Sequence, residues 1–115
     1  MAKKFPLDRV ARGELAELIV SFRLISLGYI VFKNVIRTGP VDIIAIDVET
    51  DEVFKIDVKM VRLNQDGTLE ERRKLTDKQK ELNVFIGKIV GEEALAFLKE
   101  FKLTIRDQNG RVLDV

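Results

Sequence analysis

The chain has 115 residues, of which 46% are hydrophobic and 34% charged, and this balance predicts one folded domain over residues 1–115. It contains no cysteine and no histidine, which excludes disulfides, zinc–thiolate sites, thiol nucleophiles and histidine-dependent catalysis. A bound metal would need oxygen ligands, which favours Mg²⁺ or Mn²⁺, and a net charge of +1 gives no overall signal for a polyanionic partner.

Residues 9–27 have the apolar spacing of a helix. Pro6 and Asp8 predict where this helix begins, and Gly28 predicts where it ends. Two apolar strips run along it, one made of Leu15, Leu18, Ile19, Phe22 and Ile25, the other of Ala16, Val20, Leu24 and Leu27. Because one core-facing side needs only one strip, we expect this helix to be deeply buried or to lie partly at a subunit contact.

Three strand-like segments follow, over residues 29–36, 41–48 and 53–60, all rich in β-branched or aromatic side chains. A turn signal, Thr38-Gly39-Pro40, separates the first two segments, and a charged turn over residues 49–52 separates the second from the third. Connections this short predict an antiparallel meander.

The second half of the chain predicts a loop, a capped helix and a terminal hairpin. Residues 64–68 are expected to form the loop, and Thr76 to be the N-cap of the helix. Residues 84–90 fit either helical spacing or a strand. A further helix is expected over residues 92–101, and then a hairpin that turns at Asn109 and Gly110. The order α-β-β-β-α-β, extended by the hairpin, predicts an α+β domain with a central mixed sheet and flanking helices.

The segment most informative about function is the third strand, where residues 54–59 read FKIDVK. Side chains alternate across a strand, so the apolar residues share one face and Lys55, Asp57 and Lys59 share the other. Asp57 and Lys59 therefore project side by side. A carboxylate next to an ammonium group can bind a metal ion and orient a water molecule on it.

Further carboxylates are placed where they could join this pair. Asp42 stands at the head of an apolar run, one short turn from Asp57, and two neighbouring carboxylates repel unless a cation lies between them. Glu17 is expected to be buried in the first helix, which is costly for an unpaired carboxylate. Glu14 lies on nearly the same side, and either could approach the metal. Gln79, in the capped helix, could hydrogen-bond a substrate phosphate or Lys59.

Two clusters of basic residues are candidates for phosphate contacts in a nucleic-acid complex, although either run alone fits a solvated surface better. They comprise Lys3, Lys4, Arg9 and Arg12 near the start of the chain, and Arg72, Arg73, Lys74 and Lys78 in its second half.

The order of these motifs resembles the PD-(D/E)xK nuclease superfamily, in particular the archaeal Holliday junction resolvases and small bacterial relatives. The resemblance rests on residues 13–17, 28–31, 41–45, 57–59 and 75–79. It implies a restriction-endonuclease-like α/β sandwich, Mg²⁺-dependent phosphodiester cleavage and a homodimer. Asp42, Asp57 and the Val58 carbonyl would bind the metal, Glu17 would support the metal or its water, and Lys59 would orient the nucleophile.

Two positions depart from the family pattern, because Val41 stands where a proline usually precedes the motif aspartate, and Asp57 replaces the commoner glutamate. We expect a DNA endonuclease without a small-molecule organic cofactor. The alternatives are a non-catalytic module that binds nucleic acid or protein, and a structural oligomerising domain. No apolar run reaches the length of a membrane span and no signal core is present, so we expect no membrane contact and a cytoplasmic, intracellular location.

Overall fold

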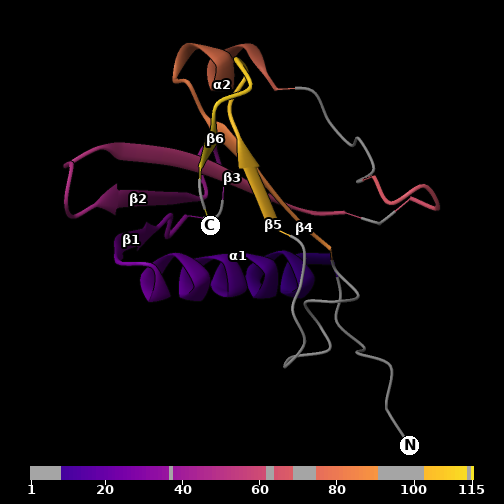
Figure 1. Cartoon of the computed structure of the whole chain (residues 1–115). Helices are drawn as coiled ribbons and strands as arrows, with labels where there is room; N and C mark the ends of the chain where they lie inside the picture. Colours follow the sequence, from indigo (N-terminus) through magenta and orange to yellow (C-terminus); the bar gives the residue numbers. More distant parts are fainter. Residues whose placement is uncertain (1–8, 37, 62–63, 69–74, 91–102, 114) are drawn as a thin grey trace, which may run out of the picture.

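The computed structural model describes residues 9–36, 38–61, 64–68, 75–90, 103–113 and 115. Within them, one helix lies along one face of a mixed sheet (Figure 1). The elements in chain order are α1 (Arg9–Ser26), β1 (Tyr29–Lys33), β2 (Ile43–Asp47), β3 (Val53–Val61), α2 (Asp77–Glu81), β4 (Phe85–Val90), β5 (Leu103–Arg106) and β6 (Val112–Leu113). This arrangement confirms the predicted α+β class and the mixed sheet. In the described part of the chain, no helix has the length and apolarity needed to cross a membrane.

The strands form one sheet in the order β1-β2-β3-β4-β5-β6, in which β3 and β4 are parallel and the other neighbours are antiparallel. The predicted meander of the first three strands is therefore confirmed. Its strand ends were predicted too long, because β1 ends at Lys33 and β2 begins at Ile43. The side chain of Asn34 accounts for the difference: its Nδ2 donates to the carbonyls of Thr38 (2.8 Å) and Val41 (3.0 Å), which holds the intervening residues in a loop.

The connection between β3 and β4 contains the predicted loop at residues 64–68 and the predicted helix cap at Thr76. The helix itself, α2, is only five residues long. It ends at Glu81 with Leu82 as its C-cap, and the next residue, Asn83, adopts a left-handed φ of 55°.

Residues 85–90 then form β4, so the helical reading of this segment is wrong. Phe85 and Ile89 are buried in the core between the sheet and α1, and this burial decides the ambiguity in favour of a strand. Gly87 is needed for close packing, because an added Cβ would lie 3.3 Å from Cγ2 of Ile56.

The terminal hairpin is confirmed as β5 and β6. Its turn is closed by Asp107, whose Oδ1 accepts hydrogen bonds from the backbone N–H groups of Asn109 (2.9 Å) and Arg111 (2.8 Å), and Gly110 has a φ of 80°. The helix expected over residues 92–101, like the expected helix start at Pro6 and Asp8, lies outside the described residues.

The core lies between α1 and the inner face of the sheet. Ala16, Val20 and Leu24 of α1 pack there against buried strand residues such as Ile43 and Ile56. Only this strip of the helix is buried deeply, so the expectation that the helix as a whole is deeply buried is wrong. The other strip stays largely in solvent, with exposed fractions of 40% for Leu18, 66% for Phe22 and 55% for Ile25.

Candidate functional site

The outer face of β3 carries the predicted acid–base pair. Phe54, Ile56 and Val58 point into the core, which confirms the predicted alternation and sends Lys55, Asp57 and Lys59 to the opposite face. Lys59 Nζ lies 3.0 Å from Oδ2 of Asp57. The Asp57 residue is only 4% exposed, so this carboxylate has little contact with solvent.

Lys55 is the third residue on the outer face of β3, and it has another role. Its Nζ donates to the Leu82 carbonyl at 3.3 Å, which satisfies the C-terminal end of α2.

Asp42 meets Asp57 across the β2–β3 pair. It directly precedes β2, and its backbone N–H donates to the Ile56 carbonyl at 2.9 Å. Its Oδ2 accepts a hydrogen bond from the Val58 N–H at 2.8 Å. The two acids predicted from the sequence are thus brought together at one point of the sheet.

The environment of Asp42 favours its protonated form. Burial, a hydrogen bond with the Asp57 side chain and the negative charges of Asp57 and Glu17 together raise the pKa of Asp42 to about 7, against the opposing hydrogen bond from the Val58 N–H. Two carboxyl groups this close repel each other when both are charged, which favours the protonated form of Asp42. A cation between the two carboxyl groups would relieve this repulsion.

The helix carboxylates are tied to β1 by a residue that the sequence analysis missed. Lys33 Nζ lies 3.1 Å from Oε2 of Glu14 and 3.9 Å from Oε1 of Glu17. The strand alternation of β1 contained the signal, because Tyr29 and Val31 face the core and Lys33 shares their face. Of the two carboxylates, Glu17 contributes to the raised pKa of Asp42.

A pocket of about 270 Å³ opens over the outer face of Asp57 and Lys59. Its other walls come from the loop before Asp42 and from α2, namely Gly39, Pro40, Thr76, Lys78 and Gln79. The pocket gives the Asp57–Lys59 pair access from outside, and Lys78 adds a second cation beside it.

Gln79 is buried in the wall of this pocket and is engaged within the protein. It forms a capping box with Thr76, in which its Oε1 accepts from the Thr76 N–H and its own N–H donates to Thr76 Oγ1, both at 3.1 Å. Its Nε2 also donates to the Pro40 carbonyl at 3.1 Å. Gln79 therefore joins α2 to the loop that ends at Asp42, and its side chain is not hydrogen-bonded to Lys59.

Removing these hydrogen bonds should destabilise the protein measurably. We expect Gln79→Ala to lower the free energy of unfolding by about 1–3 kcal/mol, because the side-chain half of the capping box and the buried hydrogen bond to Pro40 are both lost. Gln79→Glu keeps the acceptor of the capping box but places a buried carboxylate oxygen against the Pro40 carbonyl, so its loss should be at least as large. Urea denaturation of both variants beside Lys80→Ala, an exposed neighbour, checks this order. Equal stability of all three variants would contradict it.

The donor set suits a hard divalent cation. Within the described residues, no group of three or more acidic side chains is arranged to enclose a metal ion. The Asp42–Asp57 pair nevertheless supplies closely spaced carboxylate oxygens, the ligands that Mg²⁺ and Mn²⁺ prefer. Oδ2 of Asp57 is also buried and accepts no hydrogen bond from a described residue, with only the Lys59 ammonium beside it. A buried oxygen in this state fits a metal ligand.

The basic residues predicted for phosphate contact are scattered in the described structure. Lys78 lines the pocket, whereas Arg12 is exposed on α1, and Arg9 is the first residue of that helix. The remaining predicted contacts lie outside the described residues: Lys3, Lys4, Arg72, Arg73 and Lys74.

Comparison of the chain with protein-family models, with curated proteins and with solved structures found no match. The function is therefore inferred from the geometry of the site and from the motifs that compose it.

Proposed function

We propose that this protein is a metal-dependent endonuclease that hydrolyses DNA phosphodiester bonds, with branched DNA as a candidate substrate. The observation that carries the proposal is the meeting of Asp42 and Asp57 beneath an open pocket, with Lys59 Nζ 3.0 Å from the Asp57 carboxylate. Acids brought together with a lysine two residues after one of them form a site suited to phosphodiester hydrolysis.

Each residue has a distinct role in this proposal. Asp42 and Asp57 hold Mg²⁺ or Mn²⁺, with the Val58 carbonyl as a further ligand and Glu17 as support for the metal or its water. Lys59 orients the attacking water and offsets negative charge on the phosphate. When bound, the metal ion lowers the pKa of water and stabilises charge that develops at the phosphorus centre.

The fold supports the same proposal. A helix that carries Glu17 precedes an antiparallel meander that carries the two acids, and a parallel strand follows on the far side of β3. We infer a restriction-endonuclease-like domain of the PD-(D/E)xK type from this order. The exposed apolar strip of α1 supports a homodimer, because a surface strip of that kind commonly marks a protein interface.

A cleavage assay tests the function directly. Purified protein is incubated with labelled branched, duplex and single-stranded DNA, with Mg²⁺, with Mn²⁺ or with a chelator. Lys59→Ala serves as the site variant, and Lys80→Ala, which removes an exposed lysine of α2, as the matched control. We expect cleavage that requires metal, persists in the control and is lost in Lys59→Ala.

The same assay can refute the proposal. Cleavage that persists in Lys59→Ala would indicate a contaminating nuclease. Binding of DNA without cleavage under any metal condition would instead identify a non-catalytic binding module.

A further inference from the structure

A row of cations leads away from the pocket across the outer face of the sheet. The register pairs Lys59 of β3 with Lys88 of β4, and it pairs Asp57 with Ile86, which in turn pairs with Arg106 of β5. Paired residues on neighbouring strands point to the same face. Lys59, Lys88 and Arg106 therefore lie on the face that carries Asp57, and we call them the cationic row.

The cationic row has little internal charge compensation. Lys59 and Lys88 are direct cross-strand neighbours, on strands about 4.8 Å apart, and like charges in such a pair repel. Lys59 is paired with Asp57, but Lys88 and Arg106 form no ion pair with any residue that the structure describes. By contrast, Nη2 of Arg111 forms an ion pair with Oε2 of Glu52 at 2.6 Å.

The sequence analysis missed Lys88 and Arg106. The segment around Lys88 fitted a helix as well as a strand, so the face on which its side chain lies was open. Arg106 lies on the first strand of the predicted hairpin, but nothing in the sequence showed which strand would pair with the other edge of that hairpin.

We propose that Lys88 and Arg106 bind phosphates of the nucleic-acid strand on one side of the bond that is cut. The strand would leave the pocket at Lys59 and cross β4 and β5, a path of about 10 Å at ordinary strand spacing. The row supplies the positive charge that this path requires, and it is continuous with the pocket that holds the reacting phosphate. This inference rests on the proposed nuclease function and specifies how the substrate lies.

The salt dependence of binding tests this path. Fluorescence anisotropy measures the affinity of the protein for a short labelled duplex and for the matching single strand, with chelator present so that nothing is cut. The plot of log K against log salt has a negative slope. We expect the Lys88→Gln/Arg106→Gln double variant to reduce the magnitude of this slope by about 1.8 for duplex and about 1.4 for single strands.

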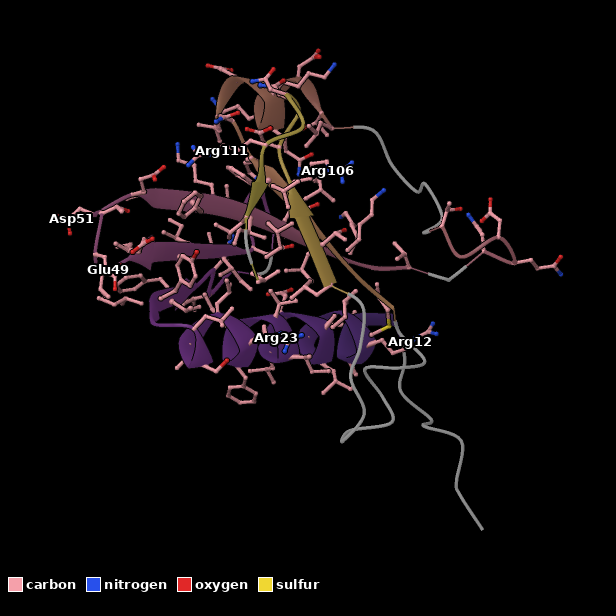
Figure 2. All side chains as sticks on the ribbon, viewed as in Figure 1. Arg12, Arg23, Glu49, Asp51, Arg106 and Arg111 are labelled. Carbon is pink, nitrogen blue, oxygen red and sulfur yellow. The ribbon has the colours of Figure 1, made fainter. Side chains whose placement is uncertain are left out.

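The matched control is Arg111→Gln, which removes a cation between β5 and β6 that is already paired with Glu52 and lies over the ring of Phe54, a residue of the core-facing side (Figure 2). We expect this variant to keep the wild-type slope. A double variant that also keeps the wild-type slope, or an Arg111→Gln variant that loses as much, would overturn the proposal. A greater effect on the binding of a polyglutamate peptide than of DNA would also overturn it, because the row would then serve a protein partner.

Failure of this inference is distinguishable from failure of the nuclease proposal, because binding and cleavage are scored separately. If the double variant shows a weaker salt dependence of DNA binding while the wild-type protein cuts no DNA, the result supports the cationic row as a phosphate-binding surface and rejects the nuclease proposal. Thermal unfolding adds a check on folding: relief of repulsion with Lys59 should raise the melting temperature of Lys88→Gln by about 1–5 °C. A lower melting temperature would show that Lys88 serves stability, and would count against the proposal.

Discussion

Replacing Asp57 by asparagine is expected to lower the rate of metal-dependent DNA cleavage by at least about 10³-fold. The substitution keeps the size of a side chain that is 4% exposed, but it removes the negative charge that faces both the metal position and Lys59. The same variant should lose most of the rise in melting temperature that Mg²⁺ produces in the wild type, because a ligand stabilises only the state that binds it.

The comparison with Lys59→Ala separates the two roles in the site. Lys59 is not proposed as a ligand, so its variant should cut no DNA and yet retain the Mg²⁺-dependent rise in melting temperature. Asp47→Asn is the matched control, since Asp47 lies on the same sheet and its side chain accepts hydrogen bonds from Glu49 and Thr50 in the β2–β3 turn. If Asp57→Asn keeps both the cleavage and the Mg²⁺ response, the metal does not bind at this pair.

Asp42 should make the stability of the metal-free protein fall as the pH rises. Its pKa is raised to about 7 in the folded state, above the ordinary value of 3.8 that applies when the chain is unfolded. The folded state therefore binds the proton more tightly, and this contribution is complete below about pH 4 and is lost as the pH rises through about 7. Mg²⁺ competes with that proton, so its stabilising effect should grow between pH 6 and pH 8.

Asp42→Asn isolates this effect, because the amide keeps an acceptor for the Val58 N–H and has no charge to repel Asp57. Without metal at pH 8, we expect the variant to exceed the wild type in free energy of unfolding by about 1–2 kcal/mol after allowance for solvent screening, with no advantage at pH 4. It should also cut no DNA. Guanidinium denaturation at both pH values measures the difference.

Asp66→Asn is a control, because Asp66 affects the pH dependence of stability with the opposite sign. Hydrogen bonds from Thr68 lower the pKa of Asp66, so its contribution to stability is present above its unfolded pKa and is lost as the pH falls. This variant should gain nothing at pH 8. An Asp42→Asn protein that is no more stable than the wild type at pH 8 would show that Asp42 and Asp57 do not repel in the folded state.

Features of the site that depend on local pattern were predictable. The alternation of residues 54–59 fixed which side of β3 carries Asp57 and Lys59, because a strand has only two faces. The short turn between two β-rich segments placed Asp42 near that strand. Thr76 was identifiable as a cap because its side chain acts within one helical turn.

Features that depend on which segments become neighbours were not predictable. The choice of strand for residues 85–90 follows from burial against α1 and from parallel pairing with β3, which no local window contains. Lys33 contacts Glu14, which is 19 residues away along the chain, and Gln79 contacts Pro40, which is 39 residues away. For the same reason the cationic row emerged only from the strand register.

The parallel pairing of β3 with β4 divides the chain into two parts with different tasks. Before it, a helix and an antiparallel meander build Asp42, Asp57 and Lys59 through contacts that are mostly close in sequence. Beyond it, α2 supplies a wall of the pocket, and β4 and β5 supply Lys88 and Arg106 of the cationic row. Contacts near in sequence form faster than distant ones, so we expect the acids to be assembled early in folding. The groups that admit substrate would join them last, and a partly folded chain would hold reactive chemistry without a place to receive DNA.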